Sequence, residues 1–121
     1  MKRSILVVPA IALAVAAGAP PQAQAGETEG AILYERAIAQ EEEARIISAP
    51  IAGIQNRLWF DYRNDIGEAQ KELASDLRRA TDIEDQRDAW SEYAHELRHE
   101  RTAYVKKMEK RGYRQGQVIV G

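Results

Sequence analysis

The residues with the clearest chemical potential are the only two histidines of the chain, His95 and His99. They are four positions apart, so a helix would place both imidazole rings on one face, one turn apart. Neutral imidazole is a common ligand of Zn²⁺, Cu²⁺ and Ni²⁺. This spacing indicates a surface that could bind a transition metal through the two side chains.

The string His95-Glu96-Leu97-Arg98-His99 also resembles the HExxH motif of zinc metalloproteases. The resemblance implies that His95 and His99 bind zinc and that Glu96 activates the bound water. It covers only these five residues. The chain has no third histidine to complete the longer metzincin motif, and Arg98 places a cation between the two ligands. No strand pattern precedes the helix to form a substrate-binding edge.

The helical phase gives a further reason to discount the motif. If Trp90, Leu97 and Tyr104 face the interior, His95 and His99 fall on the opposite, solvated face. A hydrolytic zinc site needs a shielded cleft, so we interpret the motif as a chance match and predict no enzyme activity and no resident cofactor. The chain also lacks a cysteine nucleophile and a glycine-rich loop after a strand.

The densest aromatic cluster lies between Arg57 and Arg63. Trp59 and Tyr62 can face one side of a helix, whereas Phe60 points about 100° away from Trp59. Exposed aromatic side chains beside arginine are typical of protein-binding anchors. The alternative is that an earlier helix packs on this cluster. We name Trp59, Phe60 and Tyr62 as candidate partner-binding residues.

The first 25 residues have the pattern of a cleavable secretory signal peptide. Lys2 and Arg3 are followed by the apolar run 5–17, and Ala23-Gln24-Ala25 offers the small residues that a signal peptidase recognises. The apolar run is shorter than the ~20 residues needed to span a bilayer, so we predict no transmembrane anchor after processing. The mature protein would begin near Gly26.

The composition of the remaining chain restricts its partners. The signal holds two of the 17 Lys and Arg, which leaves 15 against 19 Asp and Glu, a net charge of −4. An acidic protein is not expected to bind nucleic acid, which needs a basic surface. An exported protein without cysteine suits the bacterial periplasm, with secretion as the second choice. The charge is uneven, because residues 98–114 carry seven basic side chains and two acidic ones.

Three helical segments can be predicted in the mature chain. The first covers 29–47 and ends before Pro50. The second covers 51–80 and the third 82–111, each with apolar residues spaced by three or four. Gly112 is placed to end the third helix as a left-handed cap. We therefore expect a helical domain at 26–111 and an extended or flexible tail at 112–121.

The junction near Thr81 leaves two architectures open. Thr81 and Glu84 match a capping box, which favours a two-helix hairpin. The heptad phase nevertheless runs through without a break, and neither Gly nor Pro interrupts residues 68–111. We prefer one long amphipathic helix over 54–111, with the N-terminal helix folded back on it and coiled-coil-like packing. Such a helix would need a second copy or a partner to cover its apolar stripe.

These observations predict an all-α periplasmic protein that acts by protein–protein binding, as a chaperone or adaptor, and forms a homo-oligomer. The alternative function is transition-metal binding or sensing in the periplasm through the surface pair His95 and His99.

Overall fold

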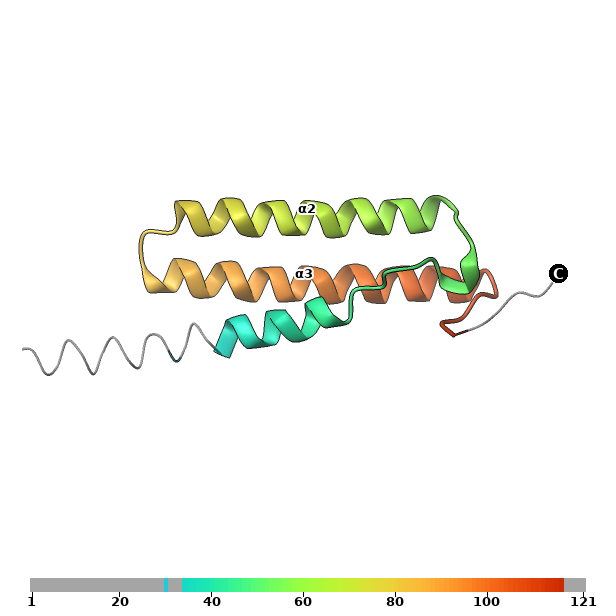
Figure 1. Ribbon diagram of the computed structural model, residues 1–121, viewed down its shortest axis with the longest axis horizontal. Coiled ribbons are helices and arrows are strands. Elements are labelled where there is room, and N and C mark those ends of the chain that lie inside the picture. Colours follow the sequence, from blue (N-terminus) through green and yellow to red (C-terminus); the bar gives the residue numbers. More distant parts are fainter. Residues whose placement is uncertain (1–29, 31–33, 117–121) are drawn as a thin grey trace, which may run out of the picture.

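The computed structural model describes residue 30 and residues 34–116. An N-terminal helix covers residues 34–44, and a short 3-10 helix, η1, covers Ile51–Gly53. Two long helices follow, α2 over Arg57–Arg79 and α3 over Ile83–Lys110. Figure 1 shows α2 and α3 side by side and antiparallel, with the N-terminal helix along α3. The described residues contain no strand, and the predicted all-α class is confirmed.

A turn at residues 80–82 separates α2 from α3, so the preferred interpretation of one continuous helix is wrong and the hairpin alternative is present. Asp82 caps α3, because its carboxylate accepts a hydrogen bond of 2.8 Å from the Asp85 amide. The Asp85 carboxylate in turn accepts bonds from the amide and the hydroxyl of Thr81, both at 3.1 Å. The N-cap is therefore Asp82 instead of the predicted Thr81, and the reciprocal bond of a capping box is replaced by bonds from Thr81 to Asp85.

The unbroken heptad phase is compatible with this turn for a simple reason. An apolar stripe that continues across a turn can be buried against itself when the chain folds back, with no second copy involved. The hairpin buries the stripe within one chain. Capping by Asp82 then satisfies amides that a free helix end would leave unpaired.

The connection between the N-terminal helix and α2 is irregular. The N-terminal helix ends at residue 44, three residues before the predicted end, and residues 46–48 belong to neither a helix nor a strand. After η1, Asn56 caps α2 by accepting a 3.1 Å hydrogen bond from the Trp59 amide. The second helix therefore begins six residues later than the sequence pattern suggested.

The end of α3 follows the sequence prediction. Gly112 has a φ of 88°, which is the left-handed conformation expected of a glycine cap. Its amide donates to the Glu109 carbonyl and the Tyr113 amide donates to the Met108 carbonyl, both at 2.9 Å. This paired arrangement is the Schellman motif, and it satisfies two carbonyl groups at the helix end.

The core lies where the three helices meet. The predicted stripes of both long helices supply most of it, and Leu97 and Met108 are its largest fully buried side chains. The rings of Tyr62 and Tyr104 stack at 4.8 Å between their centroids, which joins α2 to α3. The N-terminal helix contributes the fully buried Ala39.

Two predicted segments fall outside the described residues: the signal peptide at 1–25 and residues 117–121 of the tail. Within the ranges that the structure describes, no helix combines the length and the apolar character needed to cross a bilayer.

Candidate functional site

A pocket of about 190 Å³ lies between residues 46–48, in the irregular connection before α2, and one side of α2. Most of its wall is apolar or aromatic, and three polar side chains stand among the others. It is lined by Ile46, Ile47, Ser48, Trp59, Tyr62, Arg63, Ile66, Gly67 and Gln70. We call this pocket the α2 groove.

Two tyrosine hydroxyls fix the segment that forms one wall of the α2 groove. The Tyr62 hydroxyl accepts a 2.9 Å hydrogen bond from the Ile47 amide, and the Tyr104 hydroxyl accepts a 3.1 Å bond from the Ile51 amide. These bonds tie the connection before α2 to both long helices. The groove is therefore preformed, which lowers the conformational cost of binding a ligand there.

Backbone groups beside the groove remain available. Within the described residues, the amides of Ser48 and Ala49 make no hydrogen bond to other protein groups, and both residues are exposed. Each of these amides can donate a hydrogen bond to a carbonyl group of another chain.

Arg63 gives the groove a positive rim. Its guanidinium lies over the Trp59 ring, 5.8 Å from the ring centroid. A cation–π contact of this kind orients the side chain without neutralising its charge. The charge of Arg63 therefore favours a ligand that carries a carboxylate beside its apolar groups.

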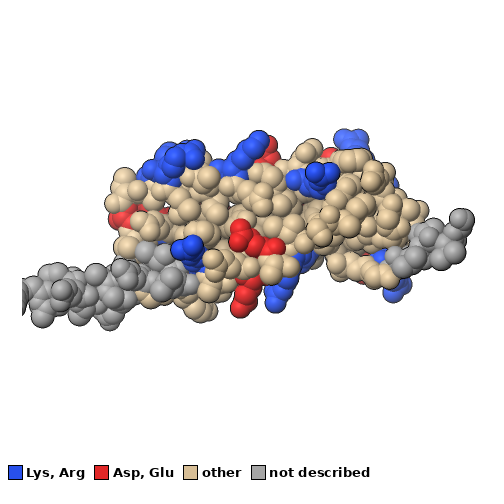
Figure 2. All heavy atoms as spheres, viewed as in Figure 1, with Lys and Arg blue, Asp and Glu red and all other residues tan. Residues whose placement is uncertain are grey.

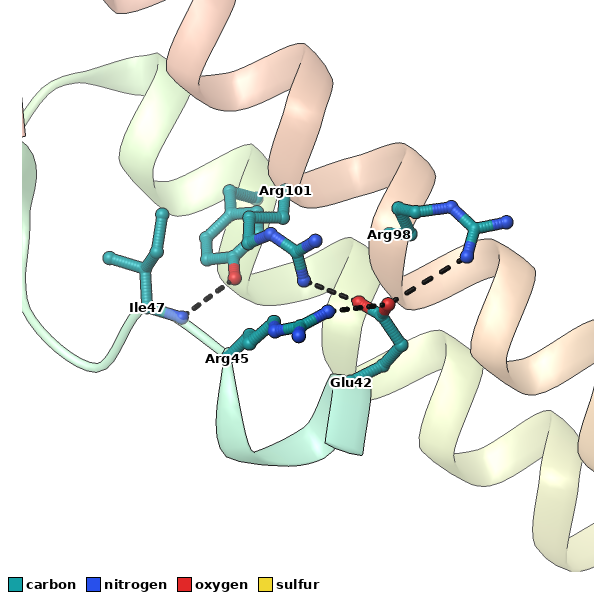
Figure 3. Close-up of polar contacts among 6 residues, drawn as sticks. Glu42, Arg45, Ile47, Arg98 and Arg101 are labelled. Carbon is teal, nitrogen blue, oxygen red and sulfur yellow. Dashed lines mark hydrogen bonds and ion pairs between the residues drawn. The ribbon is translucent and has the colours of Figure 1, made fainter. Parts of the chain in front are cut away.

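A buried carboxylate fastens the N-terminal helix to α3 (Figure 3). Glu42 is 3% exposed and accepts a hydrogen bond of 2.5 Å from Arg101. Arg45 and Arg98 also pair with it, at 3.3 and 3.7 Å. Burial by itself raises the pKa of the Glu42 carboxyl, but the bond from Arg101 and the three positive charges outweigh it and hold the pKa below its usual range.

Glu100 of α3 lies near the carboxyl of Asp65 on α2. Partial burial raises the pKa of Glu100, and the neighbouring Asp65 raises it further, because two ionised carboxylates repel each other.

Charge is divided between the two ends of the hairpin. Residues 68–96, around the turn, hold nine acidic and four basic side chains, whereas residues 97–116 hold seven basic and two acidic ones. Figure 2 shows one face of the molecule, on which charged groups stand apart among wide areas of other residues. The end of α3 next to the α2 groove is therefore the basic end.

The three predicted partner-binding residues are placed differently from one another. Trp59 and Tyr62 are 5% and 3% exposed and contribute to the floor of the α2 groove. Phe60 is 47% exposed on the outer side of α2 and does not line the groove. Trp59 and Tyr62 are core residues, since both rings also pack against Tyr104 of α3.

The structure brings His95 and His99 together on the outward face of α3. Both are exposed, and their rings are nearly parallel, with centroids 6.3 Å apart and planes at 15°. Among the described residues, no group of three or more His, Asp or Glu side chains is arranged to hold a metal ion. Arg98 of the HExxH string points to Glu42 instead of the histidines.

Sequence reasoning missed Glu42 and Arg101, because an acidic residue in an acidic segment suggests a solvated face. A signal was nevertheless present. Glu42 follows Ile38 and Ala39 by four and three positions, which places it on the apolar face of its helix.

No protein-family model, curated protein or solved structure matches the chain.

Proposed function

We propose that this chain is an exported, periplasmic helical protein that acts by binding other proteins, as an adaptor or chaperone. The observation that carries the proposal is the α2 groove. It combines apolar walls, nearby backbone amides without a protein partner and a positive rim in one preformed pocket. These features suit a segment of another polypeptide.

The groove offers a partner three kinds of contact. Beside the wall formed by residues 46–48, which has no helix or strand, the amides of Ser48 and Ala49 can donate hydrogen bonds to carbonyl groups of a partner. Apolar side chains of the partner would occupy the space beside Ile66 and Trp59. Arg63 would pair with an acidic residue of the same segment.

A site-specific photo-cross-linker tests this proposal in living cells. We would place it at Gln70, an exposed residue that lines the groove, and as a control at Arg78, an exposed residue of α2 near the hairpin turn. We expect protein adducts from position 70 that are absent from position 78. One stoichiometric adduct would indicate a dedicated adaptor, and a broad set of exported proteins would indicate a chaperone.

A blocking substitution makes the test specific for the groove. Gly67→Lys places a long side chain over the pocket, and nothing lies within 4 Å of the position that its Cβ would take. Ala74→Lys is the matched control, since residue 74 is exposed on α2 and does not line the groove. Loss of the adducts with the first variant alone would support the proposal. Adducts that survive Gly67→Lys unchanged would contradict it.

A further inference from the structure

The outward face of α3 carries a stripe of eight exposed residues, spaced by three or four positions. Its order from the start to the end of the helix is acidic, then histidine, then polar and basic. The stripe consists of Glu84, Asp88, Glu92, His95, His99, Thr102, Lys106 and Lys110. Successive spacings of four, four, three, four, three, four and four read the same in both directions. We call it the α3 stripe.

The α3 stripe is complementary to itself when two copies run antiparallel. Leu97 is the midpoint between the two histidines, and a twofold axis there would place residues at equal distances before and after it opposite each other. Asp88 and Lys106 are each nine positions from this midpoint, so acid meets base. Glu84 and Lys110 are each thirteen positions away and also form an acid–base pair.

The histidines stand at the centre of this arrangement, where their site is incomplete in one chain. His95 and His99 supply two imidazoles, and Zn²⁺ in proteins usually takes four ligands in a tetrahedron. The described residues offer no group of three or more ligands in one copy. A second antiparallel copy would bring its own pair to the same place.

We propose that two copies of this chain pair antiparallel through the α3 stripe, around a zinc-class ion held by His95 and His99 of both copies. The metal supplies the affinity, since every stripe residue is polar and surface ion pairs contribute little by themselves. The charges supply orientation, because a parallel pair would place like charges together. The α2 groove lies elsewhere on the hairpin, so this assembly is independent of the proposed partner binding.

The first test measures mass and metal content together. The purified full chain, processed as the cell processes it and stripped of metal, would be examined by analytical ultracentrifugation with and without Zn²⁺. We expect a monomer without zinc, a dimer with it, and one zinc bound per two chains by calorimetry. His95→Ala and His99→Ala should each abolish the zinc-dependent dimer. A protein that stays monomeric with zinc, or binds one zinc per chain, would overturn the proposal.

A charge swap tests the antiparallel register. Lys106→Glu places like charges opposite Asp88 at both ends of the dimer and should weaken zinc-dependent dimerisation about tenfold. Combining it with Asp88→Lys restores opposite charges and should restore the dimer. Lys71→Glu, the same charge change at an exposed position of α2, serves as the control and should have no effect. A Lys106→Glu variant that behaves like this control, or a swap that restores nothing, would refute the register.

Discussion

Replacing the buried carboxylate of Glu42 should destabilise the protein more than replacing any of its exposed partners. In Glu42→Gln, the Arg101 guanidinium, whose side chain is only 19% exposed, would lose the carboxylate that pairs with it. Breaking a buried pair from one side costs about 3 kcal/mol. Arg98 has a side chain 53% exposed, so Arg98→Gln should cost less than about 1 kcal/mol.

Urea denaturation followed by circular dichroism measures the difference directly. A small domain has a free energy of unfolding on the order of 5–10 kcal/mol, so a loss of about 3 kcal/mol is easily resolved. At roughly 4–8 °C per kcal/mol, the melting temperature should fall by about 12–24 °C. The free energies of unfolding should be compared at pH 7, with Arg98→Gln as the control.

The pH dependence provides an independent check. The pKa of Glu42 is lower in the folded protein than the ordinary value of 4.5, so its stabilising contribution is present above that value. The contribution is lost as the pH falls through the lower folded pKa. The gap between wild type and Glu42→Gln should therefore be constant near neutral pH and shrink below pH 4.5. Equal costs of under 1 kcal/mol for Glu42→Gln and Arg98→Gln would refute the reasoning.

Three further predictions concern backbone and charge. Thermal unfolding should show that Gly112→Ala destabilises the folded protein by about 1 kcal/mol, because Gly112 has a φ of 88° that alanine disfavours. Gly67→Ala, in the middle of α2, should stabilise the folded protein by about 0.5–1 kcal/mol, because alanine favours the helix and has room there. Glu100→Gln should raise the neutral-pH free energy of unfolding, measured in urea, by less than about 1 kcal/mol, since the raised pKa of Glu100 beside Asp65 means that ionisation is unfavourable in the folded state. Four flexible residues inserted before Thr81 should leave the urea denaturation midpoint nearly unchanged, because each doubling of the length of a turn costs only about 0.6 kcal/mol. A large loss of stability on this insertion would contradict the hairpin.

The apolar spacing predicted the faces of the helices well. Tyr62, Ile66 and Ala69 of the second stripe are buried, because three- and four-residue spacing determines which side of a helix faces its neighbour. The left-handed cap at Gly112 was also predictable, since few other residues tolerate that conformation.

The hairpin was harder to predict than the faces of its helices. A heptad phase is the same in a continuous helix and in a helix that turns without changing register. Whether the chain turns or continues as a helix depends on local hydrogen bonds at Asp82 and Asp85, which replace the backbone hydrogen bonds of one more helical turn. Such a competition depends on tertiary burial of the stripe, which the sequence does not display directly.

The candidate site was the least predictable part. Trp59 and Tyr62 were identified from their types, but the α2 groove exists because residues 46–48 run beside them. That path depends on hydrogen bonds with residues far along the chain, such as the bond between Ile51 and Tyr104. No local pattern encodes a contact across that distance.

The attachment of the N-terminal helix has a consequence for the order of folding. Glu42 is 59 residues from Arg101, and Glu43 is 50 residues from Tyr93, whose hydroxyl binds it. The ribosome makes the N-terminal helix first and its partners in α3 last, whereas the hairpin contacts nearest the turn are local and close rapidly. The nascent chain therefore lacks a complete core until most of α3 has been made. For a chain that is exported as proposed, late closure of the core would prolong the interval in which it can still pass through a narrow channel.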